Sequence, residues 1–131
     1  MRYHESIDYV EIPAADLEAV KVFFKQVFGW SFTDYGADYC AFSNAGLDGG
    51  FYRSEMTVAA EHGSALIVFY SRDLETTQSK IVAAGGYIKV PVFEFPGGRR
   101  FHFCDPTGNE YAVWTDAQVD TLAPLSVTQV G

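Results

Sequence analysis

Basic residues are scarce in this chain. Its 131 residues include nine Lys and Arg against 17 Asp and Glu, which gives a formal net charge of −8. Nucleic-acid binding depends on clusters of Lys and Arg that displace counterions from phosphates. The one basic pair, Arg99-Arg100, follows two glycines in a predicted turn. The composition therefore argues against a nucleic-acid partner. An acidic surface serves mainly solubility, and it also suits a cationic ligand.

Cysteine is scarce too, and long apolar runs are absent. Cys40 and Cys104 form no CxxC motif, and both fall in predicted strands, where a free thiol behaves as a small buried hydrophobe. No run approaches the roughly 20 apolar residues that span a bilayer, and the N-terminus lacks the apolar core of a signal peptide. We therefore expect a cytoplasmic protein, with reduced thiols and no membrane partner.

Aromatic residues are abundant at 16 % of the chain: eleven Phe, eight Tyr and two Trp. They exceed what a core of this size usually needs, so some of them are expected to line a cavity. An aromatic-rich core and a dimer interface are the alternatives, because aromatic residues are enriched in all three places. The length fits one domain that spans residues 1–131.

The first half begins with a strand and a helix. Branched and aromatic residues predict a strand at 7–12, and Pro13 is expected to end it because proline has no N–H to donate. Asp16 is a good N-cap for a helix that runs to about Phe28, and Gly29 suits the left-handed residue that closes it. Three further strands are predicted at 30–35, 39–42 and 49–53.

The second half repeats this order. A strand at 65–70, a helix from Leu74 to about Ala84 and three strands at 87–92, 101–104 and 110–114 are predicted, with a type I turn at 105–108. Asp73 overlays on Asp16, and Gly86 on Gly29. We interpret the chain as an α+β fold of two βαβββ modules, at about 5–54 and 64–116, followed by a tail at 117–131. The modules are expected to form a curved, cup-like mixed sheet with helices on its convex side and a small-molecule pocket in its concave face.

Three segments carry a family resemblance. Ile7 to Glu18, Phe23 to Trp30 and Asp105 to Asn109 resemble the vicinal oxygen chelate superfamily of glyoxalases, bleomycin resistance proteins and dioxygenases. The similarity covers roughly Ile7 to Thr115. It implies the cup-like fold already described, and it implies a homodimer, which is the usual state of family members.

The metal positions of this family are not kept. In its metal-dependent members four strand positions supply His and Glu ligands. The resemblance places them at Tyr9, at Gly50 or Phe51, at Leu66 and at Ala112. None of these is His, Glu, Asp or Cys, the usual ligands of zinc and similar ions. The sequence therefore predicts no metal and no cofactor, and it argues against glyoxalase I and extradiol dioxygenase chemistry, which both need a metal.

Strand alternation, counted from Tyr9 and Ala112, predicts which side chains face the cavity. Among them, His102 is either a general base or the partner of a carboxylate that orders the sheet, and we favour the second reading. Glu11 and Glu110 are either an acid and base pair or partners of basic side chains. The side chains predicted to line the cavity are Tyr9, Glu11, Tyr39, Phe51, Leu66, Arg100, His102, Glu110, Ala112 and Trp114.

Three functions are compatible with these residues. The first is a metal-free module that binds and sequesters an unidentified small molecule, as bleomycin resistance proteins do. The second is a metal-independent isomerase or lyase that uses His102 or a Glu as its base. The third is a metal enzyme of the lactoylglutathione lyase type with non-standard ligands. We rank them in that order.

Overall fold

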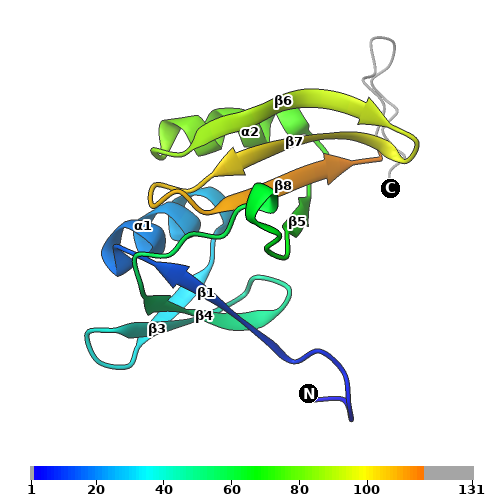
Figure 1. Ribbon diagram of the computed structural model, residues 1–131. Helices are drawn as coiled ribbons and strands as arrows, with labels where there is room; N and C mark the ends of the chain where they lie inside the picture. The colour runs from blue at the N-terminus through cyan, green and yellow to red at the C-terminus, as the bar shows by residue number, and fades with distance from the viewer. Residues whose placement is uncertain (1, 117–131) are drawn as a thin grey trace.

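In the computed structural model, which describes residues 2–116, two helices and eight strands follow one another in the predicted order (Figure 1). A short 3-10 helix at Ala60–His62 lies in the segment between the two modules, residues 54–66, which we call the linker. The elements are β1 (Tyr9–Ala14), α1 (Leu17–Phe28), β2 (Ser31–Asp34), β3 (Tyr39–Ser43), β4 (Asp48–Arg53), β5 (Ile67–Tyr70), α2 (Leu74–Ala83), β6 (Tyr87–Phe95), β7 (Gly98–Cys104) and β8 (Glu110–Thr115).

The strands form two four-stranded mixed sheets with the same internal order. The first sheet is β1-β4-β3-β2 and the second is β5-β8-β7-β6. In each, the strand before the helix pairs in parallel with the last strand of its module, and the other pairs are antiparallel. The two predicted βαβββ modules are therefore confirmed. The strands make two sheets rather than one hydrogen-bonded sheet, and the cup-like curvature stays a prediction.

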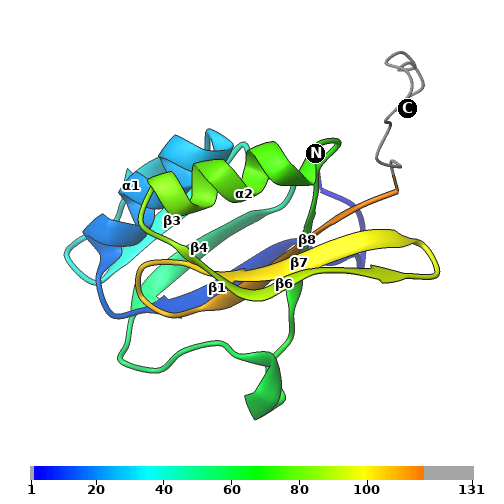
Figure 2. The same cartoon turned by 90° about the horizontal axis from the view of Figure 1, so that it is seen from above.

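Both helices lie on the same side of the sheets, next to each other (Figure 2). We call the opposite side of each sheet its open face. The predicted N-caps are confirmed: carboxylate oxygens of Asp16 and Asp73 accept the backbone N–H groups of Ala19 and Thr76, both at 3.1 Å. Gly29 closes α1 at a φ of 73°, in the left-handed region that favours glycine. Neither helix in the described part is long and apolar enough to cross a membrane.

The prediction that Pro13 ends the first strand is wrong. β1 runs through Pro13 to Ala14, because it lies at the edge of its sheet with β4 as its one partner. A proline needs no hydrogen-bond partner on the open side of an edge strand. β6 is also longer than predicted. Its ladder with β7 shifts register between Ile88 and Val90 and again between Val90 and Phe93, so its alternation could not be read from the sequence.

Aromatic rings from both sheets meet on α1. The ring centroid of Phe24 lies 4.4 Å from Trp30 and 5.7 Å from Phe51 of the first module, and 5.3 Å from Tyr111 and 6.4 Å from Phe69 of the second. Burying a side chain of this size contributes about 1.5–3 kcal/mol. The aromatic-rich core that the sequence left as an alternative thus accounts for much of the aromatic content, and α1 joins the two modules through it.

A buried asparagine also joins the modules. The Asn109 side-chain amide donates to the carbonyl of Pro13 at 2.7 Å, and its oxygen accepts the N–H of Val58 in the linker at 2.8 Å. The predicted turn holds Asn109 in place, since the Gly108 N–H donates to the Asp105 carbonyl at 2.9 Å. The turn before β8 therefore fixes the end of β1 and the linker together. The predicted tail at 117–131 lies outside the described residues.

Candidate functional site

The open face of the first sheet carries several of the predicted cavity residues. Ladder partners share a face, and Glu11 is opposite Gly50 while Tyr9 is opposite Asp48. Tyr9 is 41 % exposed and Glu11 is exposed, whereas Ile12, the next residue along β1, is buried in the core. The alternation predicted for β1 therefore agrees with the structure.

Phe51 does not line a cavity on this face. It is fully buried, opposite Ile12 in the ladder, and its ring packs against Phe24 and Trp30. The expectation that placed it in the cavity is wrong, because the register with β1 turns it towards α1. Of the two candidates for the β4 ligand position, Gly50 is the one on the open face.

Two tyrosines and a glutamate form a hydrogen-bonded chain there, the tyrosine-glutamate chain. The Tyr39 hydroxyl donates to Oε2 of Glu11 at 3.0 Å, and it lies 2.6 Å from the Tyr9 hydroxyl. Burial raises the pKa of Tyr39 well above its usual value, and the hydrogen bonds with Tyr9 and Glu11 raise it further. The Tyr39 phenol therefore keeps its proton at neutral pH.

Tyr39 reaches this place because β4 has a glycine beneath it. A Cβ atom on Gly50 would lie 2.1 Å from the Tyr39 hydroxyl oxygen and 2.9 Å from the carbonyl oxygen of Cys40. Such distances are far inside van der Waals contact, so any side chain at position 50 would displace the phenol. Tyr39 thus fills the space in which a β4 metal ligand would begin.

The residues at the four family ligand positions do not fit a metal ion. The side chains at positions 50, 66 and 112 (Gly, Leu and Ala) have no atom that can coordinate a metal, and the hydroxyl of Tyr9 is hydrogen-bonded to that of Tyr39. Zinc and related ions need His, thiolate or carboxylate ligands. In residues 2–116 no group of three or more His, Cys, Asp and Glu side chains is placed to hold a metal ion.

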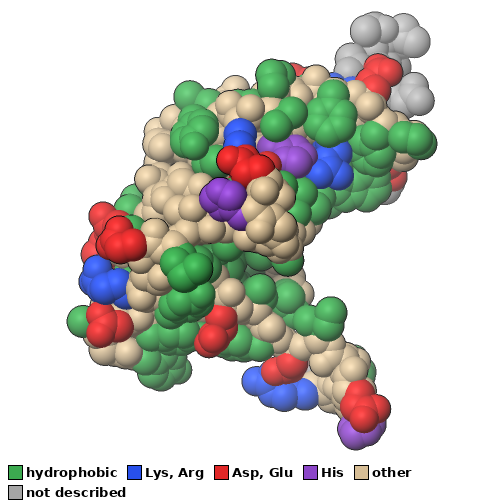
Figure 3. Space-filling model, in the orientation of Figure 1, with side chains coloured by type: hydrophobic (Ala, Val, Ile, Leu, Met, Phe, Trp, Pro, Cys, Tyr) green, Lys and Arg blue, Asp and Glu red, His purple; other side chains and the backbone are tan. Residues whose placement is uncertain are grey.

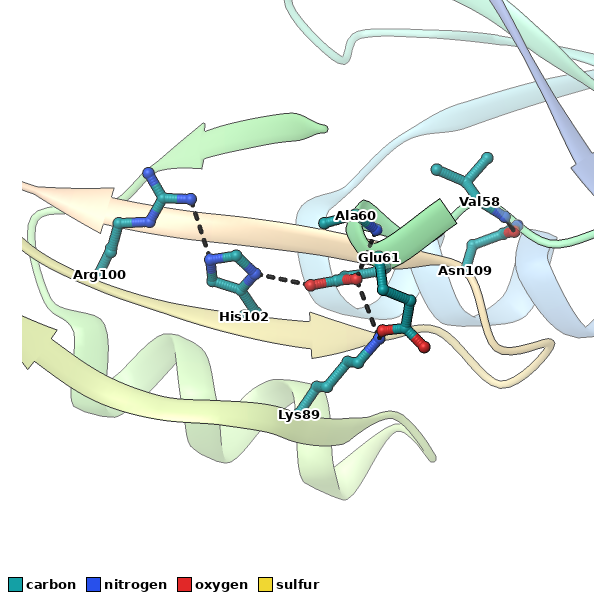
Figure 4. A network of polar contacts seen from close by, with 8 residues as sticks. Val58, Ala60, Glu61, Lys89, Arg100, His102 and Asn109 are labelled. Carbon is teal, nitrogen blue, oxygen red and sulfur yellow. Dashed lines mark hydrogen bonds and ion pairs between the residues drawn. The ribbon is translucent and has the colours of Figure 1, made fainter. Parts of the chain in front are cut away.

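The second sheet carries a different arrangement, centred on Glu110, whose contacts with the labelled residues His102, Lys89 and Ala60 are drawn in Figure 4. Its Oε2 lies 2.7 Å from Nδ1 of His102, and its Oε1 accepts from Nζ of Lys89 at 3.0 Å and from the N–H of Ala60 at 2.9 Å. A guanidinium nitrogen of Arg100 lies 2.9 Å from Nε2 of His102. We call these residues the glutamate network.

The Glu110 carboxylate is buried, and its charge is paired with that of Lys89. Glu110 is 3 % exposed. Burial alone would raise the pKa of its carboxyl, but the hydrogen bonds from His102, Ala60 and Lys89 outweigh burial and lower that pKa to about 2. Arg100 can only donate, so Nε2 of His102 accepts and its Nδ1–H donates to Glu110. Both ring nitrogens are engaged, which corresponds to the sheet-ordering role favoured from the sequence.

Arg100 and Trp114 of the second sheet lie among aromatic rings. The guanidinium of Arg100 lies 5.8 Å from the ring centroid of Phe93 and 6.0 Å from that of Phe95. Trp114, opposite Arg100 in the ladder and half-buried, contacts the rings of Tyr70 and Phe95. Ala112 is fully buried and Leu66, just before β5, is half-buried.

Sequence reasoning missed the linker and β6 as parts of the glutamate network. Lys89 of β6 bonds Glu61 of the linker at 2.7 Å as well as Glu110, so it ties the 3-10 helix to the second sheet. The register shifts of β6 hide which of its side chains face Glu110.

In the space-filling view, the surface is hollowed between the half with β1 and the half with β8, and hydrophobic side chains line the hollow (Figure 3).

One family model matches most of the chain. The model described as Glyoxalase/Bleomycin resistance protein/Dioxygenase superfamily matches residues 6–113. None of the curated proteins matches the chain.

Similar solved structures include the fosfomycin resistance protein FosX from Listeria monocytogenes, with a TM-score of 0.71 and 17 % identity over 86 % of this chain and 94 % of that one. A glyoxalase-related enzyme from Fulvimarina pelagi gives a TM-score of 0.69 and 19 % identity over 85 % and 88 %. The lactoylglutathione lyase from Agrobacterium tumefaciens gives 0.64 and 18 % over 85 % and 93 %. At these identities the likeness shows a shared fold.

Proposed function

The chain belongs to the glyoxalase/bleomycin resistance protein/dioxygenase superfamily, and from that premise we propose that it binds a small organic molecule without a metal ion. The ligand would lie against the open faces of the sheets, where most of the predicted cavity residues are found. Sequestration of the ligand is the role that this proposal favours. The fosfomycin resistance protein among the similar structures shows that the fold serves in a protein named for resistance to a small molecule.

The observation that carries the proposal is the position of Tyr39 across Gly50. A β4 ligand would need the space that the phenol fills, and the same phenol engages Tyr9, the residue at the β1 ligand position. Two of the four family ligand positions, 9 and 50, are thereby occupied by hydrogen-bonded phenol groups rather than by metal ligands. Aromatic rings on the second sheet, such as Trp114 and Phe93, add area against which a flat ligand can stack.

The enzymatic alternatives find less support. A metal-independent isomerase or lyase would have to rely on Glu11, because His102 and Glu110 engage each other in a buried pair. A lactoylglutathione lyase-like enzyme would need metal donors at positions where Gly50, Leu66 and Ala112 offer none. Sequestration therefore remains the leading proposal.

A thermal-shift screen in the presence and absence of metal tests the proposal. The purified protein would be screened with fosfomycin, bleomycin and a set of cationic, neutral and anionic aromatic metabolites. The screen would be run in EDTA and again with zinc, nickel or manganese. We expect at least one compound to raise the Tm equally in both conditions, since binding to the folded state stabilises it by mass action. Stoichiometric metal in the purified protein, or stabilisation that needs added metal, would contradict the proposal.

A homodimer is part of the same proposal. The open face of the second sheet exposes Val68, Tyr70 and Phe93, each 40 % or more exposed, and such apolar surface is typical of an interface. Sedimentation velocity at several protein concentrations measures the oligomeric state. A monomer throughout the micromolar range would exclude a stable dimer.

A further inference from the structure

The tyrosine-glutamate chain contains three oxygen-bearing side chains but only two protons. Tyr39 donates its single hydroxyl proton to Oε2 of Glu11. The 2.6 Å contact between the two hydroxyls can then exist only if Tyr9 donates to Tyr39. Both protons are used inside the chain. What it offers outward is lone pairs: those of the Tyr9 oxygen and those of Oε1 of Glu11, for which the described residues provide no hydrogen-bond donor.

The charge around the chain has the same sign as these acceptors. Asp48 lies opposite Tyr9 in the ladder, on the same face as Glu11. Arg2, a nearby cation, is already bound to Asp8, with its guanidinium nitrogen 2.6 Å from a carboxylate oxygen. The ladder positions on the described open face of the first sheet contain no Lys or Arg: they are 9, 11 and 13 on β1, 48, 50 and 52 on β4, 39, 41 and 43 on β3, and 31 and 33 on β2.

Tyrosine rings surround the acceptors. Tyr52 lies directly opposite Tyr39 in the ladder and is 38 % exposed, and Tyr9 is exposed to a similar extent. The face of an aromatic ring attracts a cation through its quadrupole. Acceptors, carboxylates and rings on one face all favour a positively charged hydrogen-bond donor.

We propose that the open face of the first sheet binds the protonated amino group of an organic cation. The ammonium N–H groups donate to the Tyr9 oxygen and to Oε1 of Glu11, and Tyr52 borders the site. This inference rests on the proposed function, because it names the class of ligand that the same face takes. An anionic ligand would meet two carboxylates, and a neutral alcohol would lack the charge-assisted hydrogen bond.

NMR titration with three probes of one shape tests the charge of the ligand. Benzylamine is cationic at neutral pH, benzyl alcohol is neutral and benzoate is anionic. We expect benzylamine to shift the amide signals of β1, β3 and β4 and to bind about tenfold more tightly than benzyl alcohol, since a hydrogen bond that involves a charged group is stronger than one between neutral groups. Benzoate should leave these signals unchanged.

Two variants locate the site and a third controls for net charge. Glu11→Gln should weaken benzylamine binding about tenfold, and Tyr9→Phe should weaken it several-fold. Glu94→Gln removes the same charge from an exposed residue opposite Arg99, whose guanidinium binds Glu75 on α2, so it lies on the helix side of the second sheet. This variant should bind benzylamine like the parent. Far-UV circular dichroism checks that each variant is folded.

The outcomes separate this inference from the proposed function. If benzoate binds at β1, β3 and β4 as tightly as benzylamine, or if Glu11→Gln and Glu94→Gln weaken benzylamine equally, the cation site is wrong and metal-free binding stands. If benzylamine shifts none of these signals while another compound of the thermal-shift screen binds, the cation site is again wrong alone. If no compound binds in the screen or the titration, both proposals fail.

Discussion

Glu11 in the first sheet and Glu110 in the second both stand on the open faces of sheets with the same strand order, yet their surroundings differ. Glu11 is exposed, and among residues 2–116 its carboxylate has one hydrogen-bond donor, Tyr39. Glu110 is 3 % exposed and its two oxygens accept from His102, Lys89 and Ala60. The Glu11 carboxylate keeps exposed lone pairs, whereas the Glu110 carboxylate is buried and accepts three hydrogen bonds from the fold.

This difference separates binding residues from structural residues within one repeated architecture. A buried carboxylate whose two oxygens both accept hydrogen bonds holds strands together, and its burial keeps a ligand away from it. An exposed carboxylate adds little to stability, so its place beside two tyrosines needs another reason. The module whose carboxylate is exposed is the one expected to bind the amino group, and Glu110 in the other module is expected to hold the linker in place.

The largest effect is expected from Glu110→Ala. Removing the carboxylate leaves the Lys89 ammonium, the Nδ1–H of His102 and the N–H of Ala60 without their shared acceptor in a partly buried place. The free energy of unfolding should fall by about 3–5 kcal/mol. Urea denaturation measures the change. Glu11→Ala is the matched control, and it should cost less than about 1 kcal/mol; equal losses would remove the distinction between the two glutamates.

The pH dependence of stability should carry the signature of Glu110. Its pKa is lowered to about 2 in the folded state from an ordinary value of 4.5. A lowered carboxyl pKa contributes stability that is fully present above about pH 4.5 and is lost as the pH falls towards 2. Because each pKa unit is worth 1.36 kcal/mol, the contribution is about 3 kcal/mol.

Unfolding free energies measured between pH 7 and pH 2.5 for the parent and for Glu110→Gln test this assignment. The difference between the two should be largest at neutral pH and should shrink as the pH falls. A constant difference across the range would mean that Glu110 titrates in the folded state as it does in the unfolded chain.

Gly49 and Gly50 of β4 separate an effect on stability from an effect on binding within the first sheet. A Cβ on Gly49 would lie 2.3 Å from the carbonyl oxygen of Val10, a backbone atom that cannot move without disturbing the ladder. Gly49→Ala should therefore destabilise the protein by about 1–3 kcal/mol. Gly50→Ala should cost less, because the first atom it meets is the end of the Tyr39 side chain, but it should abolish benzylamine binding. Chemical denaturation and NMR titration of both variants measure the two effects.

These particulars show how far the sequence reaches. Local signals predicted the helix caps at Asp16 and Asp73 and the alternation of β1, because each depends on a few neighbouring residues. The choice between Gly50 and Phe51 was not decidable, because it depends on the register between β1 and β4, which lie some 40 residues apart in the sequence. Pro13 was misjudged for a related reason: whether a strand is at an edge depends on the whole sheet.

The sequence predicted which residues belong to the candidate site, but it did not predict all of their contacts. Alternation brought His102, Glu110 and Arg100 to one face, and the structure joins them into one network. It could not reveal Lys89, since two register shifts in β6 break the alternation. Nor could it reveal that Tyr39 lies across Gly50, because a glycine in a strand indicates close approach without saying which side chain approaches.

The smallest expected effect concerns the phenol of Tyr39. Burial raises its pKa, and the hydrogen bonds with Tyr9 and the Glu11 carboxylate raise it further. Glu11→Gln removes the negative charge, so the pKa of Tyr39 should fall towards its usual value while the free energy of unfolding at neutral pH changes by less than about 0.5 kcal/mol. Alkaline spectrophotometric titration of the tyrosines measures the shift, and Tyr39→Phe assigns the signal.

Glu94→Gln again serves as the control, and its titration curve should match that of the parent. A Tyr39 signal that stays in place in Glu11→Gln would show that the carboxylate does not hold this phenol in solution. Glu11 would then not accept the hydrogen bond from Tyr39 on which the cation site is built. The contrast between the exposed Glu11 carboxylate and the buried Glu110 carboxylate would have to be explained without Tyr39.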